Sequence, residues 1–381
     1  MLELPDRVLS TKEAHRDTLY NDYQFFGVDD QFPIQTIHKH LARNIVGIIP
    51  GLQEEVHCAI DATFGKDTEN WKSLNLFEAW LGIVPRVTNR VIVGAPLCRN
   101  EEFLASQVAF ADDVVRNSFI FNMFPRIFQP LVAPLFVLSN RWHWRKSFLN
   151  AKPVIEQRLR DMVHSKPSDA NPPPEDMITW LIRQALTEGL TSELDPEMIS
   201  KRLLPVQFAA IHTTVMTGHN LLLDLLSSDP SLGYLDAIRD ETASVFAQEP
   251  SPRTWTKASL SRLHRTDSAI KESMRLSYFA RALTHRKVVA PEGVTNTVEG
   301  WHAPHGAFLM LDLAGTHRDP ELYEDPERYD AWRFSRVREE YEARVGKEEG
   351  ADPDEALRVK RLGMVTTSAE YLPFSHGRHA W

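Results

Sequence analysis

The stretch that decides the fold is Phe374-Ser375-His376-Gly377-Arg378-His379-Ala380-Trp381, the last eight residues of this chain. Gly377 lets the backbone approach a ligand closely, because glycine has no Cβ. Arg378 or a protonated His379 can pair with an anionic group. Trp381 brings an indole N–H, which donates a hydrogen bond but has no lone pair for a metal. Taken alone, the stretch also fits a frayed basic tail with an aromatic end.

Upstream, residues 271–276 read Lys-Glu-Ser-Met-Arg-Leu and place a carboxylate and a guanidinium on one helix face. Glu272 and Arg275 lie three positions apart, where such side chains meet. Pairs of this kind are common on solvated surfaces, so one pair alone decides little. A later segment, residues 326–334, carries Arg333 directly before a phenylalanine, at a distance that leaves room for strands and connections.

Further upstream, residues 196–226 carry apolar residues at helical spacing and predict one long helix. Thr213 and Thr214 stand side by side within it. A mid-helix threonine hydroxyl often bonds back to the carbonyl four residues earlier. His212 precedes the pair. Its imidazole can relay protons near neutral pH, but histidine on an apolar helix is commonly a packing residue, and the sequence leaves both interpretations open.

Taken in chain order, the four segments (196–226, 271–276, 326–334 and 374–381) resemble the signatures of the cytochrome P450 family. The resemblance is strongest to fungal members of secondary metabolism that act on terpenoid skeletons. The resemblance implies a mainly α fold with small β-sheets and haem b as cofactor. It implies a structural triad of Glu272, Arg275 and Arg333. Thr213 takes the proton-delivery position on the distal helix, and His212 replaces the usual acid beside it.

The resemblance also assigns residues around the cofactor. Phe374, Gly377, Arg378 and His379 fall in the haem-ligand loop. Arg286 opens a strand that resembles the propionate-binding strand of the family, although an exposed basic edge strand would read the same way.

One position departs from the family pattern, because Trp381 stands where the iron-binding cysteine is expected. A thiolate pushes electron density onto iron and favours O–O cleavage. Neither Cys58 nor Cys98 matches the ligand position, so no metal ligand is predicted. The alternatives are a catalytically inactive truncated remnant, a misannotated splice form, or a helical binding protein without haem. A haem carrier that uses His376 or His379 as ligand is a variant of the last.

By resemblance, the function is a monooxygenase that inserts one oxygen atom from O2 into a small apolar, terpenoid-like substrate. A flavoprotein NADPH reductase supplies the electrons in this family. The net charge of −9 and the isoelectric point near 5.9 argue against a nucleic-acid partner. The two cysteines lack metal-ligand spacing.

We expect a single domain over residues 1–381, with surface loops at 165–174 and 336–361. The expected fold is incomplete: it lacks an N-terminal anchor and the first strands, and it has no helix after the haem loop. Full-length members sit in the endoplasmic reticulum membrane. Residues 1–10 lack the apolar core of a signal peptide, so a cytoplasmic or peripheral location is expected.

The most apolar segment, residues 119–138, is interrupted by prolines and polar residues. It predicts a hairpin tip that dips into a membrane surface, or simple core. The hydrophobic spacing predicts the following helices: 33–48, 51–64, 70–84, 101–117, 150–164, 175–188, 196–226, 231–247, 257–263 and 267–276. Short strands are expected near 285–290, 294–298 and 307–311.

Overall fold

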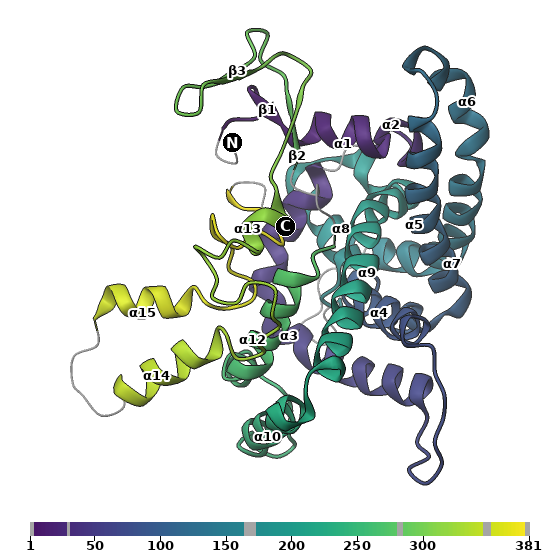
Figure 1. Ribbon diagram of the computed structural model, residues 1–381. Helices are drawn as coiled ribbons and strands as arrows, with labels where there is room; N and C mark the ends of the chain where they lie inside the picture. Colours follow the sequence, from purple (N-terminus) through teal and green to yellow (C-terminus); the bar gives the residue numbers. More distant parts are fainter. Residues whose placement is uncertain (1–3, 29–30, 164–172, 280–284, 346–351, 378–381) are drawn as a thin grey trace. The chain divides into compact units, whose positions relative to one another are not determined.

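The computed structural model describes residues 4–28, 31–163, 173–279, 285–345 and 352–377. The chain divides into two compact units, which we describe separately. The helical unit comprises Arg16–Val215 and Trp255–Lys257. The sheet unit comprises Met1–His15, Met216–Thr254 and Ala258–Trp381. The long helix α9 (Pro196–Ser227) crosses the boundary, as does α1 (Thr11–Leu19), so each unit holds part of both helices (Figure 1).

The helical unit contains no strand among its described residues. Its helices are α2 (Asn21–Gln24), α3 (Gln31–Phe64), α4 (Leu76–Ile92), η1 (Leu97–Arg99), α5 (Glu101–Asn122), η2 (Arg126–Phe128), α6 (Gln129–Phe136), α7 (Leu138–Val163), α8 (Met177–Glu188) and η3 (Thr191–Leu194). Side-chain caps begin several of them, since Asn75, Asn100 and Asp176 each accept a backbone N–H three residues on. These caps fix where α4, α5 and α8 start.

The main core of the helical unit includes the first half of α8, where Met177–Ile182 are all buried. Trp180, Ile178 and Ile182 of α8 pack with Phe103 of α5 and Ile155 of α7 in one buried cluster. A helix segment that is buried on all sides has a nearly continuous apolar sequence, as residues 177–182 do. Residues of α5 and α7 pack against this segment.

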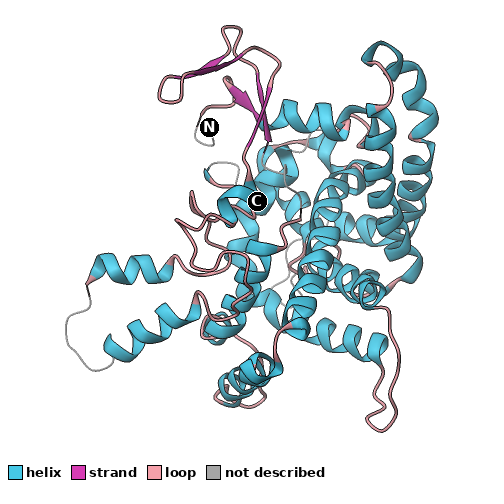
Figure 2. Cartoon of the chain, in the orientation of Figure 1, coloured by secondary structure: helices cyan, strands magenta, loops and turns pink. Residues whose placement is uncertain are grey.

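The sheet unit combines short helices with all the strands of the described chain. Its helices after α9 are η4 (Pro230–Leu232), α10 (Tyr234–Ala247), α11 (Lys257–Leu260, of which Lys257 belongs to the helical unit), α12 (His264–Leu276), α13 (Leu313–His317), α14 (Ser335–Val345) and α15 (Pro353–Lys360). Figure 2 shows how few strands accompany the helices.

Two small antiparallel sheets form in the sheet unit. The first has the order β1 (Leu9–Ser10), β2 (His285–Val288), β5 (Phe308–Met310), and the second pairs β3 (Val294–Asn296) with β4 (Trp301–Ala303). In the register of the first sheet, Leu9 faces Val288 and Arg286 faces Leu309. Burial alternates along β2, so Arg286 and Val288 point inward.

The predicted fold class, mainly α with small β-sheets, is confirmed. The element boundaries differ in informative places. Residues 33–48 and 51–64 form one helix, α3, because Ile48 and Ile49 are buried and tertiary packing holds the chain helical through Pro50. The helix expected from residue 150 begins at Leu138, and strands β1 and β4 were not predicted. The first strands were expected to be missing, yet β1 pairs with β2.

The surface-loop prediction for 336–361 is wrong for most of that range, because α14 and α15 occupy it. Their sequences are rich in charge and carry few apolar residues, so hydrophobic spacing gave only a weak signal for them. Of the other predicted loop, 165–174, only residues 173 and 174 lie in the described part of the chain. The expectation of a single domain stays a prediction.

Candidate functional site

The structure brings Glu272, Arg275 and Arg333 together in the sheet unit. Arg275 donates from Nε to Glu272 Oε2 and from Nη2 to Oε1, both at 2.8 Å, and Arg333 Nε donates to Oε1 at 3.0 Å. Glu272 and Arg275 are completely buried. A buried carboxylate that accepts from two guanidinium groups is stable only while all three remain, so the cluster fixes the geometry around α12.

Arg275 uses its remaining donors on the backbone that follows the sheets. Nη1 donates to the carbonyls of His317 and Pro326, and the guanidinium lies 4.8 Å from the ring centre of Tyr323. Arg333 donates from Nη1 to the carbonyl of Glu324 at 2.7 Å. The ion cluster therefore ties α12 to residues 317–333.

Lys271, the neighbour of Glu272 on α12, is 3% exposed and lies between two aromatic rings. Its Nζ is 4.7 Å from the ring centre of Phe334 and 4.3 Å from that of Tyr371, and it donates to the carbonyl of Gly363. Burial lowers the pKa of Lys271 to about 8. This lysine holds the segment that approaches the C-terminal loop against α12.

The C-terminal loop begins with a tight turn. Ser375 has a φ of 63° and donates its N–H to the carbonyl of Leu372, while Gly377 has a φ of 77°. His376 Nδ1 lies 2.9 Å from Thr367 Oγ1. Phe374 is half-buried and Gly377 is exposed. The other residues predicted here, Arg378, His379 and Trp381, lie outside the described residues.

Arg286 on β2 is 3% exposed, so it is not on the exposed basic edge that was the alternative. Its Nη1 donates to the carbonyl of His285, and Nη2 is buried without a hydrogen-bond partner among the described residues. Burial lowers the pKa of Arg286, and the carboxylate of Asp6 opposes this shift. A buried guanidinium nitrogen without a partner is costly, which points to an anionic ligand at this position.

Thr213 and His212 lie in the helical unit, on the first part of α9. Thr213 Oγ1 donates to the carbonyl of Ala209 at 2.6 Å, the expected back-bond. His212 Nε2 lies 3.0 Å from Oδ1 of Asp112 on α5, and Nδ1 is buried without a hydrogen-bond partner in the described chain. A carboxylate only accepts, so Asp112 favours the tautomer with the proton on Nε2 and a free lone pair on Nδ1.

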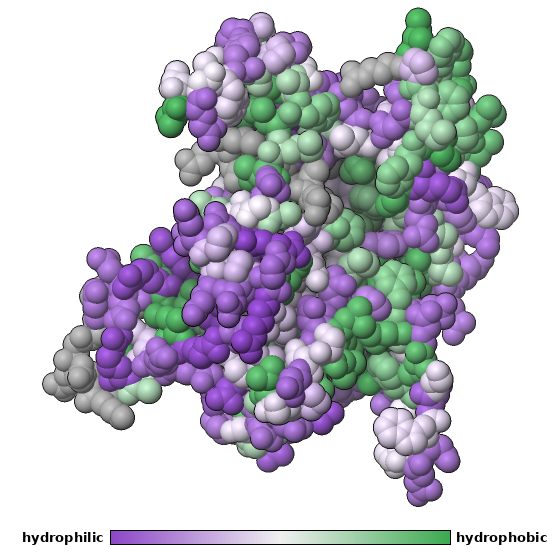
Figure 3. Space-filling view, viewed as in Figure 1, coloured by the Kyte–Doolittle hydropathy of each residue, from purple (hydrophilic) through white to green (hydrophobic). Residues whose placement is uncertain are grey.

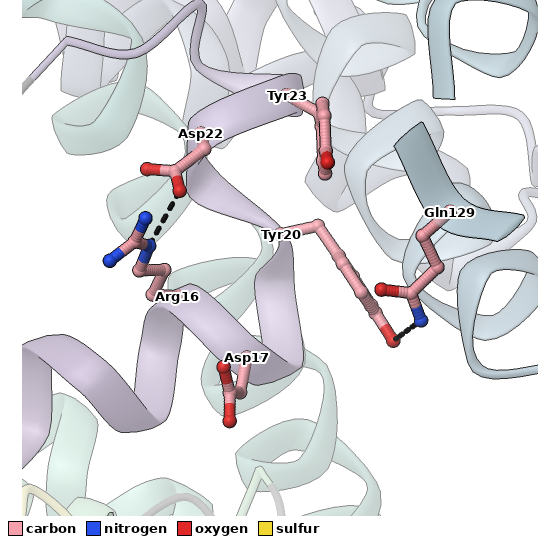
Figure 4. A pocket seen from close by; sticks show the side chains of 6 residues that line it. All are labelled: Arg16, Asp17, Tyr20, Asp22, Tyr23 and Gln129. Carbon is pink, nitrogen blue, oxygen red and sulfur yellow. Dashed lines mark hydrogen bonds and ion pairs between the residues drawn. The ribbon is translucent and has the colours of Figure 1, made fainter. Parts of the chain in front are cut away.

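Two surface hollows are present, and neither Thr213 nor a residue of the C-terminal loop lines them. The first, about 120 Å³ in the helical unit, is lined by Arg16, Asp17, Tyr20, Asp22, Tyr23 and Gln129 (Figure 4). The second, about 310 Å³ in the sheet unit, is lined mainly by charged residues, Arg333 among them. Sites for apolar ligands are typically ~300–1,000 Å³ and mostly apolar. The first hollow is too small for such a ligand, and the second is too polar.

Cys58 and Cys98 are both free thiols, and Cys58 is partly exposed while Cys98 is buried. Burial, and secondarily the carboxylate of Glu55, raise the pKa of Cys98 to about 11, so this thiol is protonated at neutral pH. Within the described ranges, no group of three or more His, Cys, Asp or Glu side chains could hold a metal ion.

Two residues of the site were missed from the sequence. Asp112 is separated from His212 by 100 positions, and no local pattern links them. His317 is completely buried and contacts both α12 and Leu372, and the sequence analysis did not single it out.

Three features point to one family of proteins: the buried Glu–Arg–Arg cluster, the tight C-terminal turn and the long helix that carries Thr213. A comparison of the sequence with family models gives the same family. The model of the family described as Cytochrome P450 matches residues 7–380. The chain belongs to the cytochrome P450 family. The resemblance inferred from the four sequence segments is confirmed.

Several curated fungal cytochromes P450 are similar over nearly the whole chain. Cytochrome P450 monooxygenase gloP of Glarea lozoyensis is 32% identical, over 100% of this chain and 70% of its own length. The monooxygenase htyF of Aspergillus rugulosus is 33% identical, over 100% and 55%. The monooxygenase pbrC of Penicillium brasilianum is 31% identical, over 92% and 63%. The chain thus spans between just over half and about two thirds of the length of these relatives.

The cytochrome P450 family implies haem, and the described residues fit one edge of that group. Arg286 supplies a buried, incompletely partnered cation of the kind that pairs with a propionate. The position where the sequence predicts the family's axial ligand, residue 381, lies outside the described residues. The described residues of this cytochrome P450 chain therefore fit the anionic edge of haem.

Proposed function

We propose that this protein is a cytochrome P450-type monooxygenase of fungal secondary metabolism that oxidises a small apolar substrate with O2. The observation that supports the proposal most is the family match over residues 7–380. The three fungal relatives are also named as cytochrome P450 monooxygenases. A terpenoid-like substrate and a flavoprotein NADPH reductase as electron donor are parts of the same proposal.

In this proposal haem b, when bound, supplies the oxygen-activating chemistry, and the chain supplies protons and position. Thr213 presents its hydroxyl on α9, where its back-bond to Ala209 orients it. His212 offers a buried lone pair on Nδ1 and is held by Asp112 through Nε2. Since the side chain of Asp112 is 62% exposed, the pair connects a buried nitrogen with solvent. This is the arrangement that proton delivery requires.

A second candidate is a chain without haem-thiolate activity, and Trp381 is the observation that favours it. The test compares the 381-residue chain with its Trp381→Cys variant, each expressed with added haem precursor. A pyridine haemochrome assay measures bound haem, and the reduced-CO spectrum reports a thiolate ligand. We expect the thiolate band only in Trp381→Cys, followed by NADPH-dependent oxidation with the reductase. A variant that binds haem with a thiolate but oxidises no apolar substrate contradicts the monooxygenase proposal.

We further propose peripheral membrane contact through the helical unit. Apolar side chains at the end of α5, on α6 and at the start of α7 are between 63% and 81% exposed: Phe119, Met123, Ile127, Leu131, Leu135 and Trp142. Figure 3 shows apolar residues gathered on α6. The sequence from 114 to 155 contains no Asp or Glu, while Arg141, Arg145 and Lys146 follow the tip.

An apolar tip with a basic flank fits a bilayer that carries anionic lipids. Among the described residues, no helix is long and apolar enough to cross a membrane. Flotation with phosphatidylserine-containing vesicles tests the contact. Leu131→Ser/Leu135→Ser should reduce binding, whereas Leu226→Ser, at an exposed leucine on the sheet-unit part of α9, should not. Equal binding by all three chains argues against a membrane contact at this tip.

A further inference from the structure

His317, at the end of α13, joins two separate backbone segments through its two ring nitrogens. Nδ1 lies 3.2 Å from the carbonyl oxygen of Arg275, and Nε2 lies 2.9 Å from the amide nitrogen of Leu372. The carbonyl can only accept and the amide can only donate. The ring is therefore neutral, with its proton on Nδ1 and its lone pair on Nε2.

The surroundings of His317 leave the ring no other position. The residue is completely buried. The ring of Tyr371 stacks on it at 5.6 Å with an interplanar angle of 24°, and Arg275 Nη1 donates to the backbone carbonyl of His317. His317 is thus fixed by Arg275 on one side, where the buried ion cluster lies, and contacts Leu372 on the other.

Leu372 in turn sets the start of the C-terminal turn. Its N–H is held by His317, and its carbonyl accepts the N–H of Ser375 at 3.0 Å. Ser375 adopts the left-handed conformation, which non-glycine residues rarely do without support from their surroundings. A shift of Leu372 would therefore displace both ends of the bond that closes this turn.

We propose that His317 is a positioning residue, which holds Leu372 by one hydrogen bond and thereby sets the backbone of the haem-ligand loop. The importance of that loop rests on the proposed function, whereas the contacts themselves do not. A histidine that only filled space would not need both ring nitrogens on the backbones of two segments.

Protonation has a definite consequence for this arrangement. An imidazolium carries a proton on both nitrogens, so Nε2 would face the Leu372 N–H as a second donor. Burial lowers the pKa of His317 to about 4, the backbone contact with Arg275 opposes the shift, and nearby Arg275 and Arg318 add to it. The neutral form, and with it the hydrogen bond to Leu372, persists throughout the neutral range.

Hydrogen–deuterium exchange on the full 381-residue chain tests the proposal without haem. In His317→Asn, the side-chain amide can replace Nδ1 but does not reach Leu372. In His317→Gln, the carbonyl oxygen can replace Nε2 as the acceptor. His317→Phe keeps the ring stack and loses both bonds. The matched control is Tyr329→Phe, which removes a buried side-chain bond to the carbonyl of Ala269, elsewhere on α12.

We expect peptides that cover residues 371–377 to exchange roughly 5- to 10-fold faster in His317→Phe and His317→Asn, as for loss of one buried hydrogen bond. Exchange should return toward the parent rate in His317→Gln, and Tyr329→Phe should leave these peptides unchanged. The proposal is overturned if Asn and Gln act alike, or if Tyr329→Phe accelerates exchange at 371–377 equally. Because no haem is present, neither result depends on whether the monooxygenase proposal holds.

Discussion

Arg275 clasps Glu272 with two parallel hydrogen bonds of 2.8 Å, and neither side chain is exposed to solvent. Two such bonds in a dry environment orient the guanidinium fully. Its remaining Nη1 then points at the carbonyls of His317 and Pro326. Through this pair, α12 is hydrogen-bonded to the segments that precede the C-terminal loop.

Breaking this pair should be costly. Glu272→Gln leaves the buried guanidinium of Arg275 and the partly buried one of Arg333 without their counter-charge, and we expect a loss of about 3–5 kcal/mol in the free energy of unfolding. Arg275→Lys should cost a similar amount, because an ammonium group cannot make the two parallel bonds. Urea unfolding followed by circular dichroism measures both. Glu327→Gln, at an exposed carboxylate that pairs with Arg318, is the control and should stay within about 1 kcal/mol.

The buried Lys271 should make the free energy of unfolding increase as the pH rises above 8. Burial lowers its pKa to about 8 from 10.5, while Asp267 opposes the shift and Arg338 adds to it. Between these values the unfolded chain binds more protons at this site than the folded chain, so the contribution of Lys271 to stability increases with pH. The Lys271→Met variant keeps the apolar stem and has no titrating group at this position. Relative to this variant, the free energy of unfolding of the parent chain should rise by up to about 1.4 kcal/mol per pH unit from pH 8 to 10.5. A difference between the two chains that is constant across this range contradicts the assignment.

The fold class followed from the family resemblance, and two local signals of the sequence placed elements of the fold correctly. The apolar spacing of residues 196–226 predicted α9 nearly to its end, and the Glu272–Arg275 spacing placed both side chains on one face of α12. Arg333 required knowledge of the family pattern, since it is 61 positions from Glu272. Their contact depends on how the chain returns to α12 after the sheets.

Other features could not be read from the sequence for physical reasons. The pairing of Asp112 with His212 depends on the packing of α5 beside α9. The helices α14 and α15 carry charge on most faces, and ion pairs such as Arg344 with Glu355 replace an apolar stripe. The role of His317 follows from two backbone contacts, and backbone contacts leave no trace in side-chain spacing.

Arg286 should affect stability and haem binding in opposite directions. Without an anionic ligand, its buried guanidinium is incompletely compensated, so Arg286→Met should raise the free energy of unfolding of the haem-free chain by about 1 kcal/mol. The same change should weaken haemin binding, which fluorescence quenching measures. Arg318→Met is the control, because Arg318 donates to Glu327 and to the carbonyl of Leu276. A loss of stability in Arg286→Met would show that the guanidinium is already satisfied by the protein.

Asp112 should matter for proton delivery and little for stability. Its side chain is 62% exposed, so Asp112→Asn should change the free energy of unfolding by less than about 1 kcal/mol. An asparagine is neutral and can either accept from the Nε2–H or donate to Nε2, so it no longer holds the proton on Nε2 and the lone pair on Nδ1. In the Trp381→Cys chain with its reductase, we therefore expect a smaller share of NADPH electrons in product and more in peroxide. Asp236→Asn, at an exposed aspartate that pairs with Arg239, is the control. If both variants couple electrons to product equally well, His212 is a packing residue and Thr213 receives its protons by another route.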